Sequence, residues 1–343
     1  MKMIVGMSGG VDSSYTARKL LSEGNEVIGA FLAMHGFAEA DAAQNAASRI
    51  GIELYTLDCM ERFDSVVKAN FVGEYLAGRT PNPCIICNPN VKFSSLLELS
   101  DRLGADKIAT GHYARVITTD KYGTVKKLIA MANDRSKDQS YMLYRLTPEI
   151  IDKLYLPLGE MTKSEVRDEL TRLGLSDLDK KDSQEICFIP DDDYVSYIES
   201  KVGRSEAGSF IDEEGRVLGR HSGIINYTVG QRKGLGISLG ERMFVTEIDA
   251  KANTVRLGRR PTESDRVELF NMVMHVPAEV VEGLDTLSVK LRYAQSTVPC
   301  RIRFMQGGRA ELILSEPARS VTPGQSAVVY DGETVVCGGI ICK

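Results

Sequence analysis

The stretch that decides the fold is Met3-Ile4-Val5-Gly6-Met7-Ser8-Gly9-Gly10-Val11-Asp12-Ser13-Ser14. A short apolar segment, predicted as a strand, passes through a loop of small residues into a helix predicted over Ser13 to Leu21. Adjacent glycines let backbone N–H groups close on an anion without interference from Cβ atoms, and the helix N-terminus adds a partial positive charge. The hydroxyls of Ser8, Ser13 and Ser14 add donors. The stretch therefore predicts a phosphate-binding turn.

The residues that the loop lacks indicate which phosphate chemistry to expect. No Lys-Ser or Lys-Thr pair follows the glycines, so the lysine of a Walker loop is missing, and so is the Gly-x-Gly-x-x-Gly spacing of dinucleotide folds. The run Ser-Gly-Gly-x-Asp-Ser resembles instead the pyrophosphate loop of enzymes that split ATP into AMP and pyrophosphate to adenylate a substrate. That resemblance implies that Asp12 helps to hold Mg²⁺ through a hard oxygen ligand. The alternative is a strand–helix turn with no ligand.

Size and composition set the class of protein. The chain has 343 residues and 43% hydrophobic content, enough for two or three domains with their own cores. No run approaches a membrane span and the first residues do not form a cleavable leader, so we expect a cytoplasmic protein without a membrane partner. The net charge is −5, so any contact with nucleic acid requires a local basic face. Seven cysteines, an odd number, indicate reactive or metal-binding thiols rather than a disulfide framework.

Alternating strand and helix patterns in the first half predict an α/β fold with a parallel sheet covered on both faces. The strands are expected at Met3–Gly6, Glu26–Leu32, Glu53–Leu57 and Lys107–Thr110, and the helices after the loop to Glu23, at Ala38–Ile50, Glu61–Ala77 and Phe93–Leu103, and from a capping box at Thr162 to Leu173. A loop is expected from Gly78 to Asn90. Because ligands bind at the carboxyl ends of parallel strands, Gly6–Ser14, Leu32–Met34 and Gly111-His112 should converge.

Beyond about Asp191, Gly-rich turns separate short apolar runs that predict β structure. The expected strands are Met243–Ile248, Thr254–Leu257, Leu287–Tyr293, Pro299–Phe304, Arg309–Leu314 and Ala327–Tyr330. We therefore predict three domains: a catalytic pyrophosphate-loop domain of the adenine nucleotide hydrolase type at 1–198, a small bridging β-rich domain at 199–262, and a C-terminal β-barrel at 263–343.

Two segments carry cysteines in contexts that suit chemistry. Cys84 and Cys87 lie in the Pro-rich segment Thr80-Pro81-Asn82-Pro83-Cys84-Ile85-Ile86-Cys87-Asn88, which predicts a rigid loop. Cys187 follows two lysines in Lys180-Lys181-Asp182-Ser183-Gln184-Glu185-Ile186-Cys187-Phe188, and their charge favours the thiolate. The Cys-x-x-Cys pair also fits a zinc half-site, a redox pair or chance burial, and Cys187 alone also fits a buried apolar residue. The remaining cysteines are expected to be structural: Cys59, Cys300, Cys337 and Cys342.

These motifs occur in one order, together with Ala109-Thr110-Gly111-His112-Tyr113, Lys137-Asp138-Gln139-Ser140-Tyr141 and Tyr227-Thr228-Val229-Gly230-Gln231-Arg232-Lys233-Gly234-Leu235-Gly236-Ile237. In this combination the sequence resembles the tRNA-specific 2-thiouridylase family, the MnmA type, over nearly the whole chain. The resemblance implies 2-thiolation of the wobble uridine, U34, in the anticodon loop of tRNAs for Lys, Glu and Gln. It implies ATP and Mg²⁺ as cofactors, tRNA as a partner, and a sulfur-relay protein or cysteine desulfurase as the sulfur donor.

The resemblance also implies the order of the steps. ATP adenylates the C2 oxygen of the uracil, a persulfide on Cys187 delivers sulfur to C2, and AMP leaves. Cys87 matches the nucleophile that releases the sulfur, which leaves a Cys87–Cys187 disulfide for a reductant to reopen. Adenylation is needed because a carbonyl oxygen is a poor leaving group, and thiolate sulfur is a good nucleophile. Many members carry Asp where this chain has Cys84, and the thiols of Cys84, Cys87 and Cys187 also suit an iron-sulfur cluster, so both mechanisms stay open, with the persulfide relay favoured.

The remaining positions carry over from the resemblance one at a time. The implied ATP contacts are Gly6, Met7, Ser8, Gly9, Gly10, Val11, Asp12, Ser13, Leu32 and Gly111, and the implied target-base loop is Asn82, Pro83 and Cys84. The implied tRNA contacts are His112, Lys137, Asp138, Gln139, Arg292, Tyr293 and Gln325. Because the target base is stacked in free tRNA, the enzyme should flip it out of the stack. His112 also fits a strand-end histidine satisfied by hydrogen bonds.

Two other classes of protein fit parts of the sequence. Another pyrophosphate-loop ligase, such as an amide-forming synthetase, would need no paired thiols. An RNA-binding protein or iron-sulfur sensor that has kept nucleotide binding would form no AMP in response to tRNA.

Overall fold

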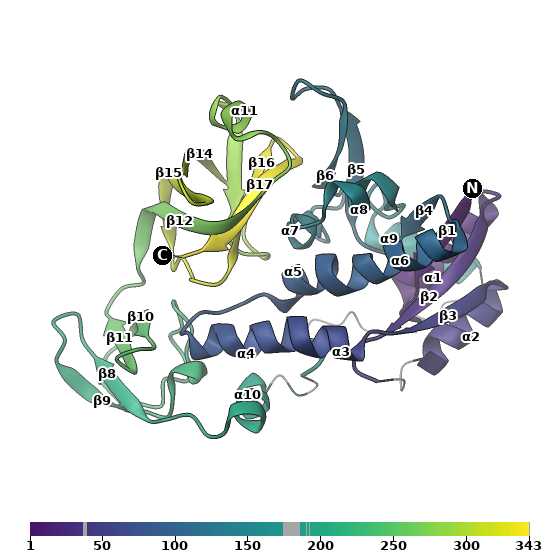
Figure 1. Cartoon of the computed structure of the whole chain (residues 1–343). Coiled ribbons are helices and arrows are strands. Elements are labelled where there is room, and N and C mark those ends of the chain that lie inside the picture. Colours follow the sequence, from purple (N-terminus) through teal and green to yellow (C-terminus); the bar gives the residue numbers. More distant parts are fainter. Residues whose placement is uncertain (37–39, 174–185, 190, 192, 343) are drawn as a thin grey trace. The chain divides into compact units, whose positions relative to one another are not determined.

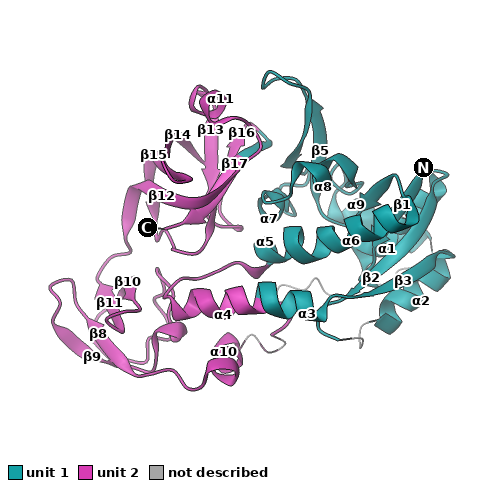
Figure 2. Ribbon diagram, viewed as in Figure 1, with its two compact units in different colours: residues 1–67, 84–184, 333–336 teal, residues 68–83, 185–332, 337–343 magenta. Residues whose placement is uncertain are grey.

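The computed structural model describes residues 1–36, 40–173, 186–189, 191 and 193–342 (Figure 1). The chain divides into two compact units, shown in Figure 2. Unit 1 comprises residues 1–67, 84–184 and 333–336, and unit 2 comprises residues 68–83, 185–332 and 337–343. No helix among the described residues combines the length and the apolar character needed to cross a membrane.

Unit 1 contains a parallel sheet, as the sequence predicts. Its strand order is β3-β2-β1-β4-β7, and every neighbouring pair is parallel. The strands are β1 (Lys2–Gly6), β2 (Glu26–Ala33), β3 (Glu53–Asp58), β4 (Lys107–Ala109) and β7 (Leu154–Tyr155). The central strand β1 is flanked on both sides, with Val5 opposite Gly29 of β2 and Ala109 of β4. This arrangement buries Met3, Ile4 and Val5 almost completely, which explains their continuous apolar run.

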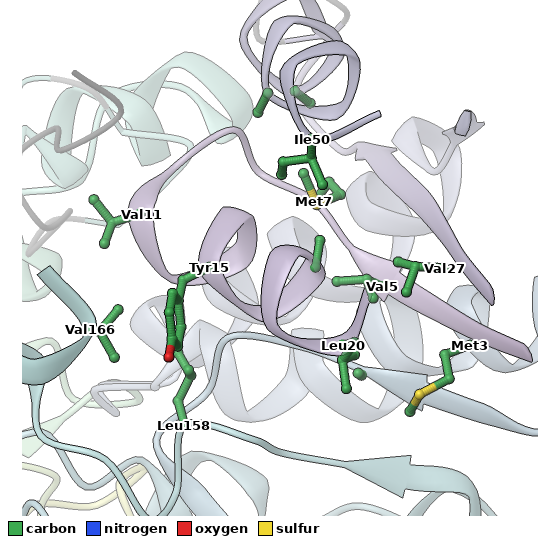
Figure 3. Close-up of a cluster of buried hydrophobic side chains, with 14 of the residues drawn as sticks. Met3, Val5, Met7, Val11, Tyr15, Leu20, Val27, Ile50, Leu158 and Val166 are labelled. Atoms are coloured by element: carbon green, nitrogen blue, oxygen red, sulfur yellow. The ribbon is translucent and has the colours of Figure 1, made fainter. Parts of the chain in front are cut away.

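The helices of unit 1 pack on this sheet or on one another. They include α1 (Val11–Ser22), α2 (Ala40–Ile50), α6 (Phe93–Leu103), α8 (Pro148–Lys153) and α9 (Lys163–Arg172). Figure 3 shows the core around α1, in which Tyr15 lies beside Val166 of α9 and Leu158. α1 begins two residues earlier than predicted, because Gly10 is in the extended conformation of an N-cap, with φ −91° and ψ 171°. The N–H groups of the first helical turn are thus at the loop itself.

The structure corrects two expectations in the segment before α6. The single helix predicted over Glu61 to Ala77 is α3 (Met60–Phe63), a π-helical turn (Asp64–Lys68) and α4 (Ala69–Leu76). The loop predicted from Gly78 to Asn90 is wrong beyond Asn82. There α5 (Pro83–Cys87) and a second π-helical turn (Asn88–Lys92) lead directly into α6. The physical reason is that Pro83 occupies the first helical position, where a missing N–H costs nothing and the fixed φ favours the helix.

Unit 1 also contains elements that the sequence analysis did not predict. They are the antiparallel hairpin β5 (Ala114–Thr119) and β6 (Lys126–Met131), and the short helix α7 (Ser140–Leu143). Glu333 accepts hydrogen bonds from Arg115 and Arg135. This ion-pair group fixes residues 333–336 to the hairpin within unit 1.

Unit 2 begins its β-rich part with a small sheet. After α10 (Tyr194–Val202), the strands β8 (Gly208–Ile211), β9 (Val217–His221), β10 (Phe244–Asp249) and β11 (Thr254–Gly258) form the order β10-β11-β8-β9. β11 and β8 are parallel, and the other pairs are antiparallel. Phe210, Val245, Val255 and Leu257 form the centre of its core.

The C-terminal strands form a closed antiparallel barrel, which belongs to unit 2 except for residues 334–336. They are β12 (Glu263–Met274), β13 (Leu287–Lys290), β14 (Val298–Met305), β15 (Arg309–Arg319), β16 (Ser326–Asp331) and β17 (Thr334–Ile341), with α11 (Ala278–Glu282) between β12 and β13. The strand order is β12-β15-β14-β13-β16-β17, and the additional pairing of β12 with β17 closes it, with Leu269 opposite Ile341. Closure removes the exposed sheet edges. The predicted fold class, a parallel-sheet domain followed by a small domain and a β-barrel, is confirmed.

Candidate active site

The loop between β1 and α1 is held by its own serines. The Ser8 N–H donates to Ser13 Oγ at 3.1 Å, and the two hydroxyls lie 3.2 Å apart. Ser13 Oγ also donates to the Gly10 carbonyl at 3.1 Å. Gly9 has a φ of +75°, and a Cβ there would lie 2.6 Å from the backbone of Ala42, so only glycine fits. The expectation for Ser14 is corrected: it is fully buried, so its hydroxyl is not accessible to a ligand.

Asp12 is the centre of a charged group at the start of α1. Lys163 Nζ lies 2.8 Å from both Oδ1 and Oδ2 of Asp12, and Tyr113 Oη donates to Oδ1 at 2.9 Å. The Lys163 side chain is 7% exposed and that of Asp12 is 31% exposed. The ammonium also lies 5.8 Å from the centre of the Tyr113 ring. The Asp12 carboxylate is an oxygen ligand of the kind that Mg²⁺ prefers, and in this structure the ammonium occupies both of its oxygens.

The carboxyl ends of β1, β2 and β4 meet at this loop. Gly111, just after β4, lies so close to Asp12 that a Cβ on it would be 2.7 Å from the Asp12 carbonyl carbon. The Met7 N–H donates to the carbonyl of Ala30 in β2 at 2.8 Å. Leu32 is buried in the last part of β2. The structure thus brings the predicted nucleotide-binding segments together in unit 1.

Cys87 lies beside the same strand ends. Its Sγ is 3.8 Å from Sδ of Met34, the residue that follows β2. Cys87 is 7% exposed. Burial raises the pKa of the Cys87 thiol to about 11, while the charge of Lys92 acts in the opposite direction. The thiol is therefore protonated at neutral pH. Cys84, one helical turn earlier in α5, is exposed.

Cys187 belongs to unit 2 and is exposed on a turn. The Ile189 N–H donates to the Ile186 carbonyl at 2.8 Å, which closes the turn. The adjacent Phe188 is buried, with its ring centre 5.3 Å from that of Phe71 in α4 and 5.3 Å from that of Tyr197 in α10. The aromatic contacts fix the turn while the thiol faces outward. The preceding Lys180-Lys181 pair, predicted to favour the thiolate, lies outside the described residues.

No group of three or more His, Cys, Asp or Glu side chains is arranged to hold a metal ion among the residues that the structure describes. There is also no disulfide among them.

Comparison with known proteins decides the family. Three family models match in succession: the tRNA methyl transferase HUP domain at residues 1–191, the tRNA methyl transferase PRC-barrel domain at 196–259 and the aminomethyltransferase beta-barrel domain at 266–341. The tRNA-specific 2-thiouridylase MnmA of Acetivibrio thermocellus is 42% identical over 357 residues, 99% of either chain. That of Lachnoclostridium phytofermentans is 42% identical over 359 residues, covering 100% of this chain and 99% of the relative. That of Geobacter metallireducens is 41% identical over 358 residues, covering 99% of this chain and 96% of the relative.

The chain belongs to the tRNA-specific 2-thiouridylase family. The family predicted from the motifs is thus confirmed, and with it the enzyme class, a tRNA-modifying sulfurtransferase.

The residues that the 2-thiouridylase resemblance assigns to tRNA contacts have internal partners in unit 1. His112 Nδ1 lies 2.8 Å from Thr110 Oγ1, and its ring packs on Phe93. Burial holds the pKa of His112 well below its usual range, so the imidazole is neutral. Asp138 is buried and accepts hydrogen bonds from the Ala132 N–H at 2.9 Å and from the Ser140 hydroxyl at 2.9 Å.

The neighbours of Asp138 share this turn. Gln139 Oε1 accepts a hydrogen bond from the Tyr113 N–H at 2.9 Å. Lys137 is half-buried, and its N–H donates to the Asp134 carbonyl at 3.1 Å. The side chains of Asp138 and Gln139 therefore shape the turn beside Tyr113, and a tRNA contact at 137–139 stays a prediction.

In unit 2 the assigned residues hold the barrel to other segments of that unit. Arg292 donates to the carbonyl of Ser320 at 2.8 Å, to the carbonyl of Val229 at 3.3 Å and to Thr322 Oγ1. Lys290 lies over the ring of Tyr293, 5.7 Å from its centre.

Gln325 Nε2 donates to the carbonyl of Thr80 at 2.8 Å, just before the predicted target-base residues Asn82 and Pro83. The Thr80 N–H donates to the carbonyl of Pro323 at 2.8 Å. Both polar backbone groups of Thr80 are thus bonded to the barrel.

Sequence reasoning missed Lys163 and Tyr113 as members of the site. Thr162 signals the start of α9, and both halves of its capping box are present. Nothing in the local sequence shows that the next residue reaches Asp12, 151 positions earlier in the chain. Tyr113 follows the predicted Gly111-His112 and ends the motif Ala109-Thr110-Gly111-His112-Tyr113, so its place after β4 and in that motif was the available signal.

Proposed function

We propose that this protein uses ATP to transfer sulfur to C2 of the wobble uridine, U34, of tRNAs for Lys, Glu and Gln, with release of AMP and pyrophosphate. The single observation that carries the proposal is the placement of Cys87 and the β1–α1 loop at one set of strand ends. In unit 1, Met34 Sδ contacts the Cys87 thiol at the end of β2, and Met7 of the loop bonds Ala30 of the same strand.

The loop suits a triphosphate. The N–H groups of Gly9 and Gly10 and the first turn of α1 supply donors and a partial positive charge, and ATP adds the Mg²⁺ for which Asp12 is a ligand. The contacts proposed for the nucleotide are residues 6–13, Leu32 and Gly111, with Mg²⁺ on Asp12. When bound, the ion neutralises phosphate charge as the uracil oxygen attacks.

The two thiols suit different tasks. We propose that exposed Cys187 receives sulfur as a persulfide from a sulfur-relay protein or cysteine desulfurase, because a donor protein can reach it. Burial keeps the Cys87 thiol protonated until substrate binds. After losing its proton, the Cys87 thiolate attacks the inner sulfur of the persulfide, forms the Cys87–Cys187 disulfide and releases hydrosulfide, which displaces AMP from the adenylated C2. Electrons from a reductant then restore both thiols.

We also propose a division of labour along the chain in the cytoplasm, where tRNA and ATP are available. Residues 1–198 bind ATP and carry catalysis, residues 199–262 connect, and residues 263–343 bind tRNA. His112, residues 137–139, Arg292, Tyr293 and Gln325 are the proposed tRNA contacts, and Asn82, Pro83 and Cys84 the proposed contacts of the flipped base.

The decisive experiment is a thiouridine assay on unmodified tRNA with ATP and a sulfur donor. Cys87→Ser and Cys187→Ser should each abolish 2-thiouridine while tRNA-dependent pyrophosphate release persists, because adenylation precedes sulfur transfer and AMP leaves only when sulfur displaces it. The matched control is Cys342→Ser at the far end of the chain, which should retain activity. Full thiolation by Cys87→Ser would contradict the proposal.

Asp12→Ala should reduce tRNA-dependent AMP formation by at least 100-fold, because phosphate charge in the transition state loses its metal. AMP is measured by chromatography. Normal AMP formation would contradict metal-assisted adenylation.

Iron and sulfide analysis after anaerobic purification tests the cluster alternative, and stoichiometric iron lost on Cys84→Ser would favour a cluster over the persulfide.

A further inference from the structure

The loop between β1 and α1 has no lysine of its own, yet a lysine ammonium reaches it from a distant helix. Lys163, the first residue of α9, places Nζ 2.8 Å from both carboxylate oxygens of Asp12. The lysine side chain is 7% exposed. An ammonium this deeply buried requires a counter-charge, so its position beside the loop is specific rather than that of a mobile surface lysine.

The backbone that carries Lys163 is fixed from several directions. The hydroxyl of Thr162 caps the N–H of Glu165 at 3.2 Å, and the Glu165 carboxylate accepts the Thr162 N–H at 2.7 Å. The Lys163 N–H donates to Asp134 Oδ2 at 3.2 Å. Val166, one turn later, packs beside Tyr15 of α1 (Figure 3). α9 therefore presents the ammonium in a fixed place relative to α1.

We propose that Lys163 is a phosphate-binding residue of this site, with Asp12 as the counter-ion that holds its ammonium in this structure. The inference rests on the proposed use of ATP. Asp12 lies in the first turn of α1, so an ammonium on its carboxylate is close to the N–H groups that the loop offers to phosphate. In the presence of Mg·ATP, Asp12 has the metal as an alternative cation, and Lys163 gains the phosphate oxygens as alternative anions. Lys163 thus supplies from α9 the charge that a Walker loop carries in its own sequence.

The partner of Lys163 is the pyrophosphate part of the nucleotide rather than the adenosine. The supporting observation is that Lys163 contacts Asp12, which follows the Gly9-Gly10 turn proposed to bind phosphate. Leu32, another proposed nucleotide contact, lies instead within β2. The proposal therefore separates ligands by whether they contain a pyrophosphate group.

The test is equilibrium binding of Mg·ATP, inorganic pyrophosphate with Mg²⁺, and AMP, without tRNA, by calorimetry. Lys163→Met should weaken the binding of Mg·ATP and of pyrophosphate at least tenfold and change the affinity for AMP less than twofold. Lys163→Arg should restore part of the lost affinity. Lys153→Met is the matched control, because Lys153 forms a partly exposed ion pair with Asp101 in the same unit. An equal loss for AMP, or unchanged Mg·ATP binding by folded Lys163→Met, would overturn the proposal.

A second variant keeps the test decisive if Lys163→Met does not fold. Asp12→Asn removes the carboxylate that competes for the ammonium, so its affinity for pyrophosphate in EDTA should rise at least fivefold over wild type. Unchanged or weaker binding would overturn the proposal. Wild-type protein that binds no Mg·ATP would refute the proposed function itself, whereas wild-type binding that Lys163→Met preserves refutes only the role of Lys163.

Discussion

At the scale of single residues, burial decides the behaviour of the Cys87 thiol. Its pKa is raised to about 11 by desolvation, so only about one molecule in a thousand carries the thiolate at pH 8. A nucleophile held in this form is protected from oxidation and alkylation. Its activation requires a change around α5, such as entry of a substrate that brings a base or a positive charge.

We predict that iodoacetamide labels Cys84 at least tenfold faster than Cys87 at pH 8, measured by mass spectrometry of the two positions. Labelling of Cys87 should increase with pH up to about 11. Because folding raises this pKa, the protonated thiol stabilises the fold fully below the pKa of the unfolded thiol, and that contribution is lost as pH rises toward 11. Equal labelling rates at pH 8 would show that Cys87 is not enclosed.

At the scale of elements, the start of α9 matters for both stability and the site. The capping box at Thr162 satisfies two N–H groups at the helix terminus. It also sets the backbone of Lys163, so that a local signal in the sequence fixes a residue of a distant loop. α5 gives the parallel case, because Pro83 starts the helix that places Cys84 and Cys87 one turn apart.

We predict that Thr162→Ala lowers the free energy of unfolding by about 1 kcal/mol, the usual cost of a lost N-cap. Urea denaturation followed by circular dichroism measures it. The matched control is Thr171→Ala in the last turn of the same helix, where the hydroxyl bonds the Arg167 carbonyl and alanine is the better helix former. Thr171→Ala should be neutral or slightly stabilising, and equal losses for both variants would contradict the capping role.

At the scale of the molecule, unit 2 joins segments from distant parts of the chain. The barrel residues Pro323 and Gln325 bond both backbone groups of Thr80, and a Cβ on Gly324 would lie 2.8 Å from the Thr80 nitrogen. The barrel therefore sets the path of the chain just before the proposed target-base residues Asn82 and Pro83. A barrel that contacts tRNA would thereby also position those residues.

We predict that Gln325→Ala lowers the turnover number of thiolation at least fivefold, because the lost hydrogen bond loosens the segment at Thr80, and that it also weakens tRNA binding, because Gln325 is a proposed tRNA contact. Filter binding and single-turnover assays separate the two quantities. Gln295→Ala, at an exposed residue of the same unit, should change neither. A large loss of tRNA affinity at unchanged turnover would contradict the role of Gln325 in positioning the segment at Thr80.

The prediction from sequence succeeded where the signal is local. The strand–loop–helix turn at 3–14, the amphipathic helix Phe93–Leu103 and the capping box at Thr162 were all predicted close to their observed positions, since short-range patterns determine them. It failed at Gly78–Asn90, where prolines were interpreted as a loop although Pro83 begins a helix. The composition of that segment favours a turn, whereas Pro83 at the first helical position and the burial of Ile85 and Cys87 favour the helix.

The sequence by itself determined the parallel-sheet fold class, the barrel, the family and the identity of the residues proposed for chemistry. Each of these depends on apolar periodicity or on motifs whose members are neighbours in the chain. Only the tertiary structure decided that Lys163 meets Asp12, that Cys87 is buried against Met34, and that Gln325 holds Thr80. These contacts join residues far apart in sequence, and the burial and charge that result exist only once the chain has folded.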